Sequence, residues 1–149
     1  MAIKIYYHLD NHGWADLHIS NGPQPINIGI SYLHDTLADF IGAANILLKG
    51  APEAEVILME EPAEYLVYLR AVDVATVTIA VSVFKEYKVI FSGEDTILSF
   101  STQIFENARR LLTEYGMESY KAKWVNHDFP IAEYERLKRE LERVLKKDR

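Results

Sequence analysis

The sequence predicts an α+β domain with an antiparallel sheet of about six strands. Several short segments alternate apolar and polar residues between turn residues, which is typical of strands that bury one face. One helical segment interrupts these strands and others follow them, and this irregular order favours an antiparallel sheet. We expect residues 1–149 to form a single domain, because a chain of 149 residues can bury one core.

An N-terminal three-stranded meander is the first feature of the predicted sheet. Its strands are expected at residues 2–8, 14–20 and 24–30, with turns at Asp10–Gly13 and at Asn21 and Gly22. Pairing His8 with Trp14 places Ile5 opposite Leu17. A two-residue loop at the second turn places Ile26 opposite Leu17. Both turns therefore predict the same buried face.

A long helix is expected directly after the third strand, within Ser31–Gly50. Apolar residues from Leu33 to Leu48 recur at helical spacing and form one stripe. Ser31 is a good N-cap, while Gly50 and Pro52 end the helix.

The rest of the chain completes the sheet and then becomes helical. Further strands are expected at Val56–Met59, Tyr65–Arg70 and Ala75–Phe84, and Lys88–Phe91 either continues the last of these or adds a strand. Two or three C-terminal helices follow: one over Ile104–Tyr115 that ends at Gly116, a short turn at Tyr120–Trp124, and a last helix that begins near Pro130.

Composition narrows the classes of function. The chain has no cysteine, which excludes disulfides, thiol catalysis and cysteine-based zinc sites. It has no apolar run of the roughly 20 residues that a membrane helix needs, and no signal-peptide pattern, so we expect a cytoplasmic protein without a membrane partner. The net charge is −6, and residues 1–75 alone hold three Lys or Arg against ten Asp or Glu. This half cannot supply a basic nucleic-acid surface and suits a basic protein partner better.

An acidic segment, Glu53 to Glu64, is the first candidate binding surface. Its five carboxylates belong to Glu53, Glu55, Glu60, Glu61 and Glu64. Carboxylates on one surface could dock a basic protein. A plain solvated sheet edge, with Pro62 ending a strand, is the alternative interpretation.

A second candidate is the Tyr6 face, the outward side of the first hairpin. It consists of Tyr6, His8, Trp14, Asp16 and His18. Aromatic, imidazole and carboxylate groups on one sheet face could bind a small molecule or a protein. The alternatives are an ordinary solvent-facing side of the sheet and a side covered by the C-terminal helix.

Catalytic and metal motifs are absent from the sequence. His8, Asp10 and His12 cross the first turn, but their spacing matches no metal motif and suits a turn. No nucleophile elbow and no Gly-rich phosphate loop is present. We therefore expect no catalytic residue, no metal and no cofactor.

Several local features, taken in order, resemble one family. The set is Gly13 with Trp14, Ser31 to Leu33 with Asp35 and Asp39, Glu61 with Pro62, Tyr120 with Trp124, and Phe129 with Pro130. It resembles a family of small, acidic, uncharacterised bacterial proteins and spans nearly the whole chain. Small acidic α+β proteins of this kind are often immunity proteins that neutralise secreted toxins, which is an analogy of class.

The leading interpretation is therefore a non-enzymatic, cytoplasmic protein-binding domain of immunity-like type. Its partner would be a basic protein such as a toxin domain, held by the acidic segment. One alternative is a small-molecule-binding protein or an enzyme that uses the Tyr6 face. Another is a structural homodimer formed through a sheet edge or the aromatic face.

Overall fold

The computed structural model describes residues 3–23, 25–125 and 127–147, so the predicted strand starts at residues 2 and 24 lie outside the described residues. The strands are β1 (Lys4–Leu9), β2 (Trp14–Ser20), β3 (Pro25–Ser31), β4 (Glu53–Met59), β5 (Glu64–Ala71), β6 (Thr76–Val83) and β7 (Lys88–Thr96). The helices are α1 (Thr36–Leu48), α2 (Ile97–Lys123) and α3 (Ile131–Lys147). The chain is thus α+β, as predicted.

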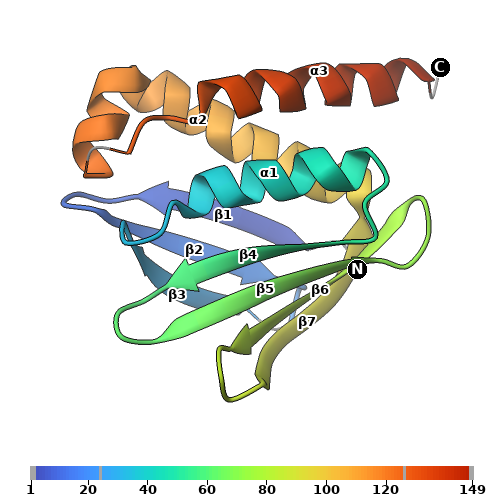
Figure 1. Cartoon of the computed structure of the whole chain (residues 1–149), viewed down its shortest axis with the longest axis horizontal. Coiled ribbons are helices and arrows are strands. Elements are labelled where there is room, and N and C mark those ends of the chain that lie inside the picture. Colours follow the sequence, from blue (N-terminus) through green and yellow to red (C-terminus); the bar gives the residue numbers. More distant parts are fainter. Residues whose placement is uncertain (1–2, 24, 126, 148–149) are drawn as a thin grey trace.

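The strands form two antiparallel sheets, so the prediction of one sheet of about six strands is wrong. The first sheet has the order β1-β2-β3 and the second β4-β5-β6-β7. In Figure 1 the two sheets lie one behind the other, with the helices across one side of both. Side chains of α1 occupy the edge of β4. The Thr36 hydroxyl donates a hydrogen bond to the Ile57 carbonyl, and the Ile57 N–H donates one to the Asp39 carboxylate. Alternation along a strand predicts its buried face but does not say what lies at its edge.

The position of the longest helix is a second correction. α1 follows the third strand as expected but has 13 residues, whereas α2 follows β7 and spans 27. Helix α2 begins seven residues before the predicted start, where the Thr96 hydroxyl accepts a hydrogen bond from the Ser99 N–H and caps it. Gly116, the predicted stop, takes φ 71° and ψ 179° and divides α2 into two helical segments.

The three-stranded meander is confirmed, with each pairing shifted by two residues. Leu17 lies opposite Tyr7 and Ile28, not Ile5 and Ile26. The second loop is longer than predicted, because Ser20 pairs with Pro25 and not with Pro23. A shift of two residues leaves each side chain on its face, so the predicted buried face is correct.

Side chains of α2 occupy the free edge of β1. Gln103 accepts the Ile5 N–H at 2.8 Å, and Asn107 accepts the Tyr7 N–H at 2.9 Å and donates to the Ile5 carbonyl at 3.0 Å. Arg110 continues the series by donating to the Tyr7 carbonyl. Four helical residues rise about 6 Å, close to the nearly 7 Å of two strand residues, so side chains four apart meet every second strand residue.

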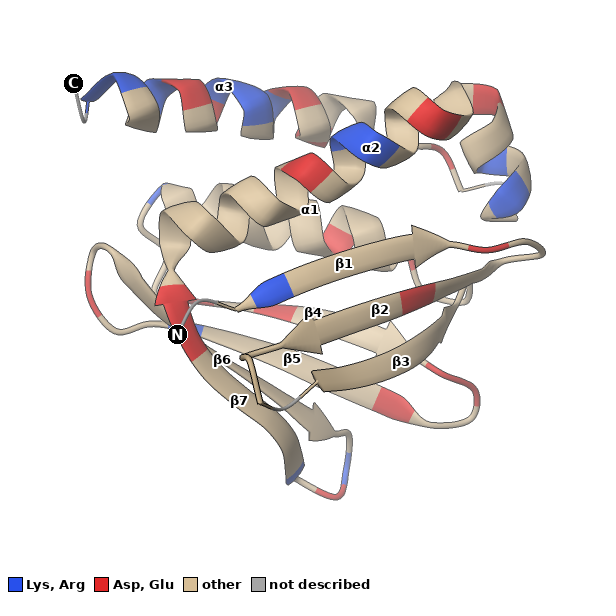
Figure 2. Ribbon diagram, turned by 180° about the vertical axis from the view of Figure 1, so that it is seen from behind, with Lys and Arg blue, Asp and Glu red and all other residues tan. Residues whose placement is uncertain are grey.

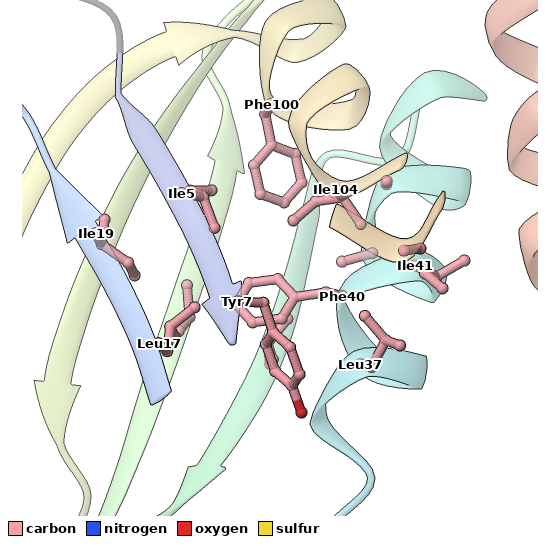
Figure 3. Close-up of a cluster of buried hydrophobic side chains, with 14 of the residues drawn as sticks. Ile5, Tyr7, Leu17, Ile19, Leu37, Phe40, Ile41, Phe100 and Ile104 are labelled. Atoms are coloured by element: carbon pink, nitrogen blue, oxygen red, sulfur yellow. The ribbon is translucent and has the colours of Figure 1, made fainter. Parts of the chain in front are cut away.

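The core is one hydrophobic cluster to which both sheets and all three helices contribute. Figure 3 shows its centre, to which the first sheet contributes Leu17 and Tyr7, α1 contributes Phe40 and α2 contributes Phe100. All four side chains are at most 2% exposed. In the described ranges, no helix combines the length and apolar character that a membrane span requires.

Candidate docking surface

The structure places the acidic segment on one hairpin of the second sheet. Glu53 and Glu55 point outward from β4 and are exposed, Glu60 and Glu61 lie in the turn, and Glu64 begins β5. The segment lies toward the sheet side of the molecule, whereas most Lys and Arg residues are on α2 and α3 (Figure 2). The helices also carry glutamates, so the acidic segment differs from them in holding acidic residues without Lys or Arg.

The five glutamates form no ion pair with the cations that the structure describes. In the described residues, none of the ion pairs within 4.0 Å includes one of them. Glu53 lies opposite Arg70 in the strand register but accepts its short hydrogen bond from the Tyr68 hydroxyl, at 2.5 Å. Tyr65 donates to Glu60 at 3.1 Å. The hairpin therefore presents a negative field to solvent.

These hydrogen bonds also affect the two tyrosines. The pKa of Tyr68 is raised, first by its hydrogen bond to Glu53. The pKa of Tyr65 is raised mainly by desolvation and then by the charge of Glu60. Both hydroxyls therefore remain protonated donors at neutral pH, which holds the glutamates in place without cancelling their charge.

The structure brings the five residues of the Tyr6 face onto one side of the first sheet. Tyr6 pairs with His18 across the strands, and His8 pairs with Asp16. The Tyr6 ring centroid lies 6.4 Å from that of His8 and 6.1 Å from that of His18. Trp14 begins β2 on the same side and is 39% exposed.

Charged neighbours interact with two side chains of this face, Tyr6 and His8. The Arg110 guanidinium carbon lies 4.4 Å from the Tyr6 ring centroid, and His8 Nε2 lies 3.2 Å from Asp10. An open groove of about 530 Å³ runs beside Tyr6 and His18 and is also lined by Lys4, Asn27 and Gln103. The arrangement could hold a polar ligand but contains no nucleophile with an adjacent base.

A buried polar cluster around Asp35 was not predicted as a unit. Asp35 Oδ2 lies 3.9 Å from His127 Nδ1, while His127 Nε2 contacts the Tyr32 carbonyl at 2.7 Å. The hydroxyls of Tyr7 and Tyr120 are buried without a hydrogen-bond partner, and the Trp124 side chain interacts with the Asp35 carboxylate. Burial is the main reason that the pKa of Asp35 is raised, and His127 opposes that shift.

This cluster fastens the segment after α2 to the start of α1. Several residues of the set that resembles a family lie at this junction. Asp35 and Trp124 belong to the cluster itself. Gly13 lies beside them, because its carbonyl accepts the Tyr32 N–H and its N–H donates to the Lys123 carbonyl. A Cβ at Gly13 would lie 2.5 Å from the Tyr32 ring, so this position requires glycine. Gly13, Asp35 and Trp124 are therefore far apart in the sequence but lie in one packed junction. Across the described residues, no group of three or more His, Asp or Glu side chains is placed to hold a metal ion.

The sequence did not single out as a candidate surface the turn between β6 and β7, residues 84–87, which we call the aromatic turn. Phe84 is 46% exposed and Tyr87 89% exposed, and Val89 beside them is 56% exposed. The available signal was two large aromatic residues that flank a charged pair, Lys85 and Glu86.

Comparisons with models of protein families, with curated proteins and with solved structures find no match for this chain.

Proposed function

We propose that this chain is a non-enzymatic, cytoplasmic protein-binding domain that docks a basic protein through the acidic segment, as immunity proteins dock toxin domains. The observation that carries the proposal is the lack of cationic partners at Glu53, Glu55, Glu60, Glu61 and Glu64 in the described structure. Carboxylates without ion-pair partners on an exposed hairpin attract a positively charged surface and speed its association.

The hollows of the surface are of a size that also admits small ligands, so their lining decides between the candidate functions. Those described measure between 300 and 530 Å³. The groove between α2 and α3 is lined by apolar residues and salt-bridging groups, among them Phe105, Leu141 and Arg109. Of the two glutamates that line this groove, Glu106 and Glu142, the first is paired with Arg109 at 2.6 Å and is therefore not a free carboxyl for acid–base chemistry.

The test is the kinetics of binding to the protein that the purified chain captures at low salt from its native host, identified by mass spectrometry and then purified. The acidic triple variant, Glu55→Gln, Glu60→Gln and Glu64→Gln, should lower the association rate constant several-fold. For the wild type, that rate constant should also fall as ionic strength rises.

A matched control variant removes three charges elsewhere. Glu114→Gln, Glu118→Gln and Glu142→Gln change exposed glutamates of α2 and α3, none of which forms an ion pair within 4.0 Å in the described structure. This control should bind with kinetics close to the wild type. Equal association rates for the wild type and the acidic triple variant at low salt would rule out the acidic segment as the docking surface.

Small-molecule binding at the Tyr6 face is the second candidate function, and the groove beside Tyr6 and His18 is the observation that favours it. A Tyr6→Ala variant would remove the ring over which Arg110 lies. A panel of polar metabolites that raises the melting temperature of the wild type but not of this variant would support this function instead.

A further inference from the structure

We propose that the docking surface is centred on the aromatic turn, with Tyr87 and Phe84 as anchors that enter an apolar pocket on the basic partner. This inference rests on the proposed function, because it names the centre of the same surface and the shape of the partner that it fits.

The aromatic turn and the β4–β5 turn, which carries Glu60 and Glu61, lie at the same end of the four-stranded sheet, toward the lower left of Figure 1. The Phe84 N–H donates to the Glu64 carbonyl at 2.8 Å, so the aromatic turn begins beside the last residue of the acidic segment. Tyr65 lies opposite Val83 in the strand register and feels the charges of both Glu60 and Glu86. The exposed rings are therefore set among carboxylates.

Folding gains little from these rings where they lie. Tyr87 leaves 89% of its surface in solvent, and large aromatic side chains normally contribute by being buried. Tyr87 and Lys85 also have φ angles of 55° and 71°, a conformation that non-glycine residues rarely adopt. An exposed, fixed aromatic turn is instead typical of residues that anchor an interface.

The charges around the aromatic turn define the partner. Lys85 and Lys88 lie at this end, and the Lys85 ammonium is 6.0 Å from the Phe84 ring centroid. Four glutamates, Glu60, Glu61, Glu64 and Glu86, outnumber these two lysines. An apolar centre with a polar rim is the usual anatomy of an interface. The partner that fits this surface is therefore a protein with an apolar pocket inside a basic rim.

Another exposed apolar residue provides a control at the opposite end of the sheet. Val74 is 99% exposed in the β5–β6 loop and borders a hollow lined by Leu47, Leu48 and Val144. The glutamates of the acidic segment do not line that hollow. Val74 therefore matches Tyr87 in exposure but not in its charged surroundings.

The experiment places the photo-crosslinking residue p-benzoylphenylalanine at position 87, 61 or 74 of the full chain in its native host. Irradiation should join the same basic protein to positions 87 and 61 and leave position 74 free of adduct, with adducts identified by mass spectrometry. An adduct at position 61 but not at 87 overturns the aromatic anchor and leaves the proposed function standing. Absence of adducts at both positions, or an acidic partner there, overturns both.

Kinetics with the crosslinked protein, once purified, give a second readout. Tyr87→Ala should raise the dissociation rate constant about tenfold or more and leave the association rate constant nearly unchanged. Phe84→Ala should act in the same direction, and Val74→Ala should change neither constant. A dissociation rate for Tyr87→Ala equal to that of the wild type overturns the anchor, even where the acidic triple variant still slows association.

Discussion

The helix-covered side of the molecule and the turn end of the four-stranded sheet use polar side chains in opposite ways. On the covered side, Gln103 and Asn107 of α2 satisfy the edge of β1, and Thr36 and Asp39 of α1 satisfy that of β4. At the turn end, Glu60, Glu61 and Glu64 have no cationic partner in the described chain.

The difference separates the residues that folding uses from those that it leaves available. A buried strand edge without partners would cost free energy for each backbone group, so the helix side chains at the two edges stabilise the fold. An exposed carboxylate contributes little to stability. The residues of the turn end are therefore the ones that a partner can use without competing with folding.

The largest effect should follow from removing a side chain that satisfies the β1 edge. Asn107→Ala leaves the Tyr7 N–H and the Ile5 carbonyl without partners, and Asn107 is 7% exposed. We expect the free energy of unfolding to fall by about 2–4 kcal/mol in urea denaturation. Thr113→Ala, on the exposed side of the same helix, should change it by less than about 0.5 kcal/mol. Equal losses from both variants would mean that α2 supports β1 only through apolar packing.

A smaller loss is expected at the β4 edge. Thr36→Val keeps the shape of a fully buried side chain but removes its hydrogen bond to the Ile57 carbonyl. The free energy of unfolding should fall by about 1–2 kcal/mol, because the carbonyl loses one partner while Asp39 still accepts the Ile57 N–H. An unchanged unfolding midpoint would show that this edge tolerates an unpaired carbonyl.

The two edges also explain which part of the fold was predictable. The buried face of each strand follows from alternation: Ile5 and Leu17 are buried as predicted, and Ile26 is partly buried against the core. The division into two sheets depends on Thr36 and Asp39 reaching Ile57, 21 and 18 residues away in the chain. No local pattern encodes a contact between a helix side chain and a distant strand edge, so the single sheet was the simpler interpretation.

The candidate surface was predictable to a similar degree. Charge density alone identified Glu53 to Glu64, since acidic residues are visible one by one in the sequence. The aromatic turn was not identified, because Phe84 and Tyr87 look like ordinary core residues until their exposure is known. The cluster around Asp35 needed residues from β1, the β3–α1 loop and the end of α2, which only the folded chain brings together.

The partly buried carboxyl of Asp35 provides a test on the helix-covered side, because ionisation of this side chain should lower the stability of the fold. Its pKa is raised from 3.8, mainly by burial, so the folded state binds the proton more tightly than the unfolded state. Wild-type stability therefore loses a contribution as pH rises above 3.8. The unfolding free energy of Asp35→Asn, relative to wild type, should increase over the same rise in pH.

Asp73, in the β5–β6 loop, should show the opposite sign. Backbone N–H groups of Ala75 and Thr76 hydrogen-bond to its carboxylate and lower its pKa from 3.8. This charged form stabilises the folded state, and the contribution is lost as pH falls through the lowered pKa. Asp73→Asn should therefore lose stability relative to wild type at neutral pH and approach it in acid. Parallel pH profiles for the two variants would contradict the assignment of both shifts.

The smallest effect on stability should come from the acidic triple variant, in which Glu55, Glu60 and Glu64 become Gln. Glu55 is exposed, and the other two are half-buried in or beside the turn. After the Glu60→Gln substitution, the side-chain amide oxygen can still accept the hydrogen bond from Tyr65, so only the charge is lost. The free energy of unfolding should stay within about 0.5 kcal/mol of wild type in urea denaturation.

The direction of any residual change in this variant is also determined by the charges. Because repulsion among the carboxylates is removed, the change should be toward greater stability and should shrink as salt is added. A loss of more than about 1 kcal/mol, the scale of one buried hydrogen bond, would mean that the fold itself needs these charges. The turn end would then resemble the helix-covered side, and slower binding by the same variant could no longer be assigned to the surface alone.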